Sequence, residues 1–191
     1  MRSLVLLAAA ASAAHAAPAR CAKMTCTAVH GFPGRWLAIQ EVDYDGRPVH
    51  VRGTGFSGKA ALVDDADREL WSNEWDASTP GHQKTWTLVD LDGDGRDELL
   101  EYDDYTGHFG SGSQLLIVHQ IASDQQSPTE IGRTATVEER NSCRSTWKLV
   151  GRRIELVTTH SRVAKLGSPP PSCRSEGRHV LAWSTAGWQE M

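Results

Sequence analysis

An acidic segment that begins at Asp90 carries the clearest chemistry in this sequence. It reads Asp-Leu-Asp-Gly-Asp-Gly-Arg-Asp-Glu, so carboxylates occupy its first, third and fifth positions, at Asp90, Asp92 and Asp94. Calcium takes about six to eight oxygen ligands, at roughly 2.3–2.6 Å. Gly93 and Gly95 allow a tight turn in which alternate residues point to a common centre. The segment therefore predicts a site for one calcium ion.

The remaining ligands can come from residues further along the chain. Arg96 would offer only its backbone carbonyl, with its charged side chain turned away. Glu98 at the ninth position can bind the ion directly, or Glu101 at the twelfth can bind it through both oxygens, and the spacing leaves both choices open. The alternative to a metal site is a solvated turn, since Asp-Gly pairs are common in hairpins. Three alternating aspartates without a cation would repel one another, which favours the metal site.

The spacing also satisfies the EF-hand expression, with Glu101 in the last position. Pro80-Gly81 leaves too little room for an entering helix, and 85–89 has the composition of a strand. The segment instead resembles the calcium loops of FG-GAP and VCBS-type repeats, which lie between β-strands. The resemblance covers only this loop. The calcium shell that it implies consists of Asp90, Asp92, Asp94, the Arg96 carbonyl and Glu98.

Known catalytic patterns are missing from the sequence. It contains neither the Gly-x-Ser-x-Gly elbow of a serine hydrolase nor the His-x-x-x-His pair of a zinc hydrolase. We therefore expect a protein that is not an enzyme. A hydrolase site, if there were one, would need a carboxylate pair assembled from distant strands.

A segment rich in glycine, hydroxyl groups and aromatic rings runs from Tyr105 to Ser113. Loops on rigid scaffolds often carry function, so this segment is either a partner-binding loop or a plain flexible connector. Its candidate contact residues are Tyr105, His108, Phe109 and Ser111. Trp71 and Trp75 are further candidates, because they flank a polar Ser-Asn-Glu stretch and exposed aromatic side chains suit protein interfaces.

Short strand-like runs dominate the rest of the chain. They are rich in β-branched and aromatic residues and are separated by turn residues. The expected hairpins pair 36–42 with 48–51, 61–63 with 69–71, 86–89 with 98–102, 146–150 with 154–158, and 179–183 with Trp188. Only 135–140 allows a short helix. The sequence thus predicts a mainly β fold of antiparallel hairpins, forming a sandwich or a small closed sheet with the calcium loop between two strands.

The resemblance to FG-GAP and VCBS-type repeats also implies a propeller. Propeller blades need about 40 residues each and usually repeat their signature. This sequence holds one such loop, so a single loop that staples one hairpin is the simpler interpretation.

The first sixteen residues have the pattern of a secretory signal peptide. Arg2 is followed by the apolar run Leu4 to Ala14, and Ala14-His15-Ala16 places small residues where a signal peptidase cleaves. The apolar run is too short to span a membrane. The expected organisation is a signal peptide at 1–16 and a single β-rich domain at 17–191, located in the periplasm or secreted.

Four cysteines in an exported protein predict two disulfides. Three pairings are open. Pairing Cys21 with Cys26 and Cys143 with Cys173 is favoured, because the shortest loops close at the lowest entropic cost.

Acidic residues outnumber basic ones by 24 to 20, a net charge of −4. Nucleic acid is therefore not an expected partner, since binding phosphates requires a basic face. The signal peptide, the single acidic loop and the β pattern together resemble the periplasmic inhibitor and immunity proteins of bacteria, some of which guard against peptidoglycan-cleaving effectors.

This second resemblance implies a non-catalytic protein-binding module whose partner is a cell-wall-degrading effector. Several lysozyme inhibitors carry a Ser-Gly-x-x-Tyr loop, and the corresponding stretch here, 111–115, has no tyrosine. That departure puts a lysozyme-type mechanism in doubt. The alternatives are an envelope structural or adhesion module and a hydrolase of cell-wall glycan or peptide.

Overall fold

The computed structural model describes residues 16–43, 47–48, 57–75, 82–106, 112–123, 127–137, 143–161, 174–184 and 186–191. In this part of the chain, a short 3-10 helix, η1 (Ala19–Ala22), precedes twelve strands. The strands are β1 (Thr25–Ala28), β2 (Arg35–Val42), β3 (Ser57–Asp64), β4 (Glu69–Trp75), β5 (His82–Val89), β6 (Glu98–Thr106), β7 (Gly112–Gln120), β8 (Thr129–Val137), β9 (Cys143–Val150), β10 (Arg153–Ser161), β11 (Gly177–Ser184) and β12 (Gly187–Glu190).

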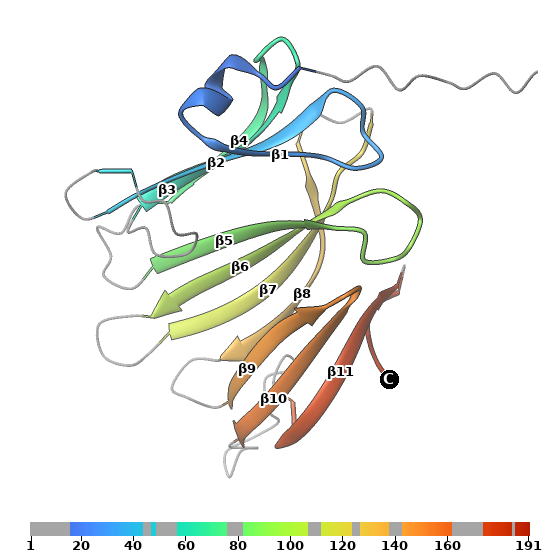
Figure 1. The fold of residues 1–191 in the computed structure, drawn as a ribbon. Helices are drawn as coiled ribbons and strands as arrows, with labels where there is room; N and C mark the ends of the chain where they lie inside the picture. Colours follow the sequence, from blue (N-terminus) through green and yellow to red (C-terminus); the bar gives the residue numbers. More distant parts are fainter. Residues whose placement is uncertain are drawn as a thin grey trace, which may run out of the picture.

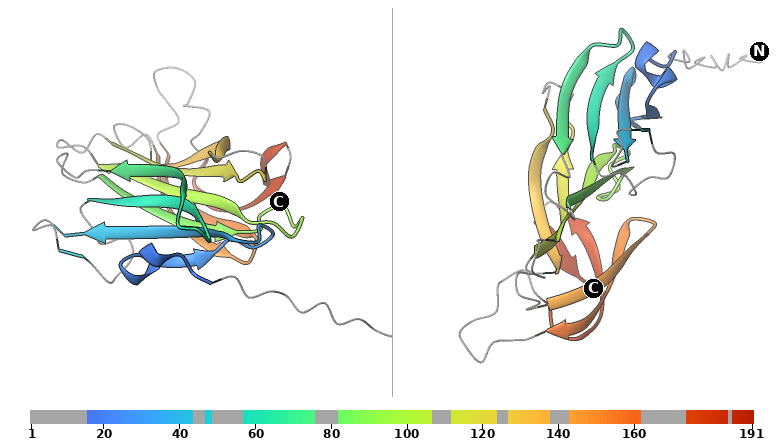
Figure 2. Two further views of the ribbon diagram at one scale, coloured as in Figure 1. Left: turned by 90° about the horizontal axis from the view of Figure 1, so that it is seen from above. Right: turned by 90° about the vertical axis from the view of Figure 1, so that its left-hand side faces the viewer.

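The strands form three consecutive groups of four, each an antiparallel meander (Figure 1). β1–β4 make one sheet. β5–β12 make a second, whose halves β5–β8 and β9–β12 are joined, among the described residues, by the single residue pair Val137↔Arg144. Figure 2 shows the three groups following one another along the molecule. The predicted mainly β fold is confirmed as a packing of small sheets, and none of the described sheets closes into a barrel.

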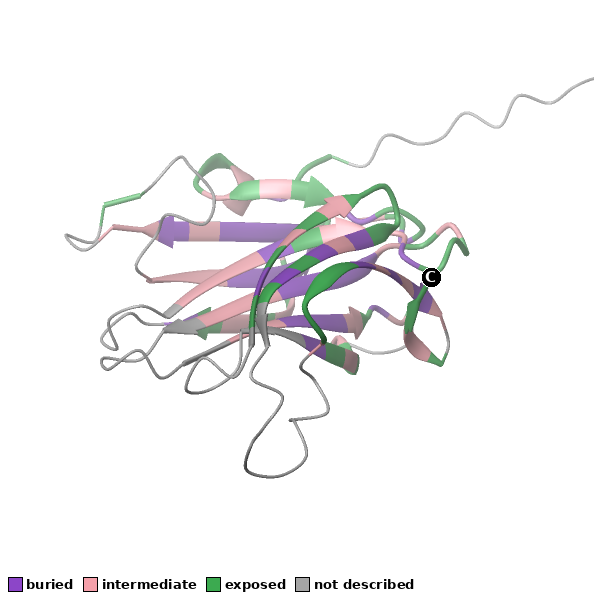
Figure 3. Cartoon of the chain, turned by 90° about the horizontal axis from the view of Figure 1, so that it is seen from below, coloured by how far each residue is buried: buried purple, intermediate pink, exposed green. Residues whose placement is uncertain are grey.

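The middle group, β5–β8, carries an apolar core on each face, because successive side chains of a strand point to opposite sides. Leu99 of β6 packs in a cluster with Leu62 of the N-terminal sheet. Leu100, the next residue, packs in a second cluster with Leu156 and Leu181 of the C-terminal group. Figure 3 shows buried and more exposed residues alternating along these strands. Neighbouring residues of β6 therefore serve different layers.

Four of the five expected hairpins are confirmed, as β3–β4, β5–β6, β9–β10 and β11–β12. The expected partner of 36–42 is wrong. β2 pairs with β3 along its whole length, and Val42 makes only an isolated bridge to Pro48. The reason is burial: Ala60, Leu62 and Val63 of β3 are almost inaccessible, so this apolar strand belongs at the centre of a sheet.

The short helix that the sequence allows over 135–140 is not found at its start, since β8 extends to Val137 and pairs with β7. The Cys21–Cys26 disulfide is present and links η1 to β1. Cys173 lies outside the described residues, as does 1–15, so the second bridge and the signal peptide stay predictions. Among the described residues, no helix has the length and apolar character needed to cross a bilayer.

Candidate functional site

The acidic loop connects β5 to β6, directly after the pair Val89↔Glu98. Strands flank it on both sides, which confirms the rejection of an EF-hand. Gly93 and Gly95 have φ angles of +86° and +87°, in the left-handed region where a side chain is unfavourable. Leu91 is buried in the core shared with the C-terminal strands and anchors the loop from within.

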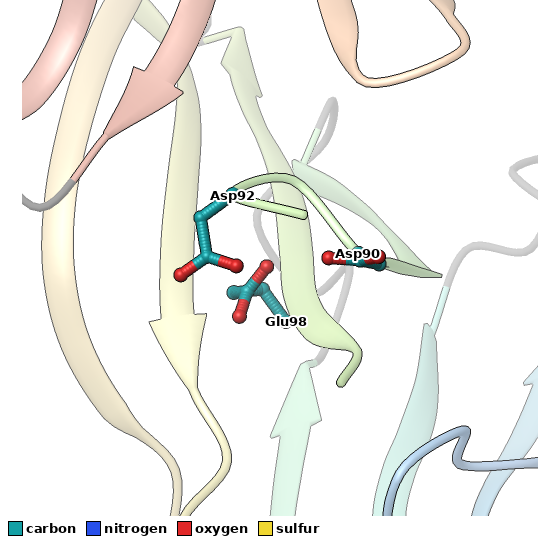
Figure 4. Close-up of side chains that lie close together, drawn as sticks. All are labelled: Asp90, Asp92 and Glu98. Carbon is teal, nitrogen blue, oxygen red and sulfur yellow. The ribbon is translucent and has the colours of Figure 1, made fainter. Parts of the chain in front are cut away.

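Three carboxylates converge at this loop. One oxygen from each of Asp90, Asp92 and Glu98 lies within 4.8 Å of the others. Figure 4 shows the carboxylates of Asp92 and Glu98 pointing toward one another, with Asp90 on the other limb of the turn. Asp94 is exposed and lies outside the group. Of the predicted carboxylate ligands, the fold therefore gathers three.

Backbone N–H groups of the loop donate to its own carboxylates and hold its shape. The contacts run from Gly93 N to Asp90 Oδ1 (2.7 Å), from Asp94 N to Asp92 Oδ1 (3.0 Å), from Arg96 N to Asp94 Oδ1 (2.8 Å) and from Leu91 N to Glu98 Oε2 (2.8 Å). Such bonds from a backbone to a nearby aspartate are typical of tight turns.

Glu98 is the unusual group of the loop. Its residue is only 5% exposed. Its pKa is raised to about 7, chiefly by burial; the N–H of Leu91 offsets part of the rise, and the charges of Asp92 and Asp94 add to it. A carboxylate that is buried among acidic neighbours gains most from a nearby cation.

Glu101 does not reach the loop, and its prediction as a calcium ligand is wrong. It lies three residues after Glu98 on the same strand, so its side chain points to the other face of the sheet. There its Oε1 accepts from Lys84 Nζ at 2.6 Å, and its Oε2 lies 2.7 Å from His119 Nε2. Burial opposes the charge of Glu101, but the hydrogen bonds from His119 and Lys84 prevail and lower its pKa.

The contacts around Glu101 form a separate network on the face toward the N-terminal sheet. Lys84 Nζ also lies 3.4 Å from Asp103 Oδ2. The rings of His119 and Trp86 lie 5.7 Å apart, and Lys84 sits above the same indole. Carboxylate, ammonium and imidazole are acid–base groups, so this network offers proton-transfer chemistry.

The acidic loop also contacts the N-terminal sheet layer. His30 N donates to Asp97 Oδ2 at 2.7 Å, and Asp97 N donates to His30 O at 3.1 Å. Arg96 lies over the Phe32 ring, with Cζ 5.9 Å from its centroid, and its backbone packs against Gly31. On the opposite side, Arg152 of the β9–β10 turn reaches Asp90. The loop therefore touches all three strand groups.

Sequence reasoning missed Lys84, His119 and Arg152. Lys84 and His119 come from strands on either side of β6, and only the register of those strands brings them to Glu101. Arg152 stands in a turn and carries no motif. A usable signal exists for Lys84, because it precedes buried Trp86 by two residues and so shares its face.

The predicted partner-binding residues are placed only in part. His108, Phe109 and Ser111 lie outside the described residues, and Tyr105 is placed by its backbone pair with Ser113. β6 has nine residues, and at about 3.3 Å per residue its far end lies roughly 27 Å from the acidic loop. His108, Phe109 and Ser111 stay predictions, as does a binding role for Tyr105.

The prediction that Trp71 and Trp75 are exposed is wrong. Trp75 is buried, and the half-buried Trp71 packs against the same N-terminal core. Trp71 meets Trp86 edge to face at 5.4 Å, which ties β4 to the middle group. Both indoles belong to the packing between sheets.

Comparison of the chain with protein-family models, with curated proteins and with solved structures finds no match in any of the three. The donor set of the acidic loop consists of carboxylate oxygens, which suit a hard cation such as calcium and not a soft one. Three carboxylates leave room for backbone carbonyls and water in a shell of about six to eight oxygens.

Proposed function

We propose that the chain is an exported protein that binds one calcium ion at the acidic loop, through Asp90, Asp92 and Glu98. The observation that carries the proposal is the convergence of these three carboxylates within 4.8 Å, one of them buried. Asp94 and the Arg96 carbonyl complete the shell in the family that the loop resembles, and they are the next candidates here.

Calcium would act on this chain as a structural cation. It offsets the repulsion among the gathered carboxylates, and it favours the charged form of Glu98. Because the loop contacts His30 of the N-terminal layer and its Leu91 packs in the core shared with the C-terminal strands, a bound ion would stiffen the junction of three strand groups. A ligand that binds only the folded state stabilises it by about 2.7 kcal/mol at a hundredfold excess over Kd.

Calorimetric titration of the chelator-treated protein tests the calcium proposal. We expect one ion per chain and a higher melting temperature with calcium than with chelator. Asp92→Ala combined with Asp94→Ala should abolish both effects. Glu74→Gln is a matched control, because it removes an exposed acidic charge that pairs with Lys59 far from the loop. An unchanged melting temperature of the wild-type protein in calcium would refute the site.

We further propose that the protein is a non-catalytic binding module of the periplasm, an inhibitor or immunity protein for a cell-wall-degrading effector. The support is the resemblance of the export signal, the single loop and the β architecture to such proteins. Thr106 and Gly112, the residues on either side of 107–111, are paired at the ends of β6 and β7.

Capture from a periplasmic extract tests the binding proposal. A bound cell-wall hydrolase would support it, and capture of an envelope scaffold alone would favour the structural or adhesion alternative. The double variant Tyr105→Ala with Phe109→Ala should weaken capture while leaving calcium affinity unchanged. Undiminished capture by that variant would remove the connection 107–111 from the interface.

A hydrolase is the second candidate, and the network of Glu101, Lys84 and His119 favours it. In such an enzyme, His119 would move a proton and Glu101 would orient its ring, as carboxylate–histidine pairs do elsewhere. The test is release of soluble fragments from purified peptidoglycan, compared between the wild-type protein and His119→Asn. Cleavage that is lost in His119→Asn would establish an enzyme and overturn the inhibitor proposal.

A further inference from the structure

We propose that Arg152 is the resident counter-ion of the acidic loop, and that a divalent cation bound there displaces its guanidinium from Asp90. This inference rests on the proposed calcium site and adds to it a residue from a different strand group. Arg152 stands in the two-residue turn between β9 and β10, beside Gly151, which has a φ of +60°. Its Nη2 lies 3.2 Å from Asp90 Oδ2.

The guanidinium lies directly on the backbone of the loop. A Cβ atom built on Gly93 would collide with Arg152 Nη1. The approach therefore depends on a glycine at this position, in addition to the left-handed φ that the turn requires. Arg152 thus meets the loop at two points, the Oδ2 of Asp90 and the backbone of Gly93.

The two oxygens of Asp90 have different partners. Oδ1 accepts the N–H of Gly93, so Oδ2 is the oxygen more open to a cation, and Arg152 occupies it. An ion held by Asp90, Asp92 and Glu98 would carry two positive charges within a few ångströms of the guanidinium. Like charges at such a separation repel, and the Arg152 side chain is 59% exposed, so it can leave toward solvent at low cost.

The displaced residue belongs to a strand group with little sheet pairing to the middle group. Among the described residues, β9–β12 are joined to β8 by a single residue pair, and the apolar core packs the two groups together. That core includes Leu91 of the loop itself. A cation bound at the loop would therefore alter the β9–β10 turn, because Arg152 would lose its contact with Asp90.

The calcium affinity of Arg152→Gln tests the inference. We expect binding about three- to tenfold tighter than in the wild-type protein, because a competing positive charge has been removed. Arg153→Gln is the matched control. It removes the same charge one residue along, on the exposed side of β10, and should change affinity by less than about twofold.

Amide hydrogen exchange supplies a readout that does not depend on affinity. Calcium should speed exchange at Gly151 and Arg152 in the wild-type protein, as the guanidinium leaves the loop, and should leave exchange at these amides unchanged in Arg152→Gln.

The failures of the two proposals are distinguishable. Equal or weaker calcium binding by Arg152→Gln, or slower exchange of the turn in calcium, would overturn the displacement while the calcium site stands. Absence of calcium binding in both the wild-type protein and Arg152→Gln would overturn the calcium site and this inference with it.

Discussion

Glu98 and Glu101 lie on one strand, three residues apart, and both are almost fully buried. Their electrostatic surroundings are opposite. Glu98 has acidic neighbours and its pKa is raised to about 7, whereas Glu101 has Lys84 and His119 as partners and its pKa is lowered. Burial raises the pKa of both groups, so the difference comes from their hydrogen-bond partners and from the neighbouring charges.

This difference arises because side chains alternate between the two faces of β6, so the two glutamates lie in different layers. Glu101 lies in a network in which Lys84 already supplies a positive charge. Glu98 reaches a loop in which the basic group Arg152 pairs with Asp90. The Glu101 network therefore supplies its own counter-charge, whereas the acidic loop around Glu98 would gain from an external cation.

The largest expected effect is the loss of Glu101. Glu101→Gln leaves the half-buried Lys84 without its main carboxylate partner, a change that typically costs about 3–5 kcal/mol of folding free energy for a buried pair. Urea denaturation should show the same loss in calcium and in chelator, because this network does not touch the loop. A loss below about 1 kcal/mol would contradict the comparison.

Removing the charge of Glu98 should have the reverse effect on the metal-free protein. Because its pKa is raised from an ordinary 4.5, Glu98 contributes stability that is present below pH 4.5 and is lost as the pH rises through about 7. Glu98→Gln should therefore unfold less readily than the wild-type protein at pH 8 in chelator, by on the order of 3 kcal/mol at most.

Calcium should raise the stability of the wild-type protein at pH 8 and leave that of Glu98→Gln nearly unchanged.

Glu101 has the opposite pH dependence. Its lowered pKa contributes stability that is present above 4.5 and is lost as the pH falls through its value in the folded protein. Thermal unfolding between pH 3 and pH 8 in chelator measures both pH dependences, the loss of stability at high pH from Glu98 and the loss at low pH from Glu101. A wild-type protein that is no less stable at pH 8 than at pH 6 would contradict the raised pKa of Glu98.

The smallest effects concern the backbone of the loop with every charge kept. Gly95→Ala should cost about 1–2 kcal/mol of folding free energy, because alanine is unfavourable at a φ of +87°. The added Cβ meets no neighbouring atom, so no clash increases this cost. Gly93→Ala should cost more, because its Cβ also displaces Arg152. Equal losses for the two variants in chelator would mean that Arg152 is not held against Gly93 in solution.

Local pattern alone was enough to predict the acidic loop, the strands beside it and the turns of four hairpins. These features depend on residues close together in the chain: carboxylates at alternate positions, glycines where φ is positive, and β-branched runs between turns. The Cys21–Cys26 bridge was predicted for the same reason, since a short loop closes at low entropic cost.

Tertiary structure decided the rest. Spacing left Glu98 and Glu101 as equal candidates, and the two faces of β6 separated them. The exposure of Trp71 and Trp75 was predicted wrongly because their polar neighbours say nothing about the middle strand group packed against β4. Lys84, His119 and Arg152 reach the two glutamate regions only through strand register and the docking of separate hairpins. Such contacts join residues far apart in the chain, and no local pattern encodes them.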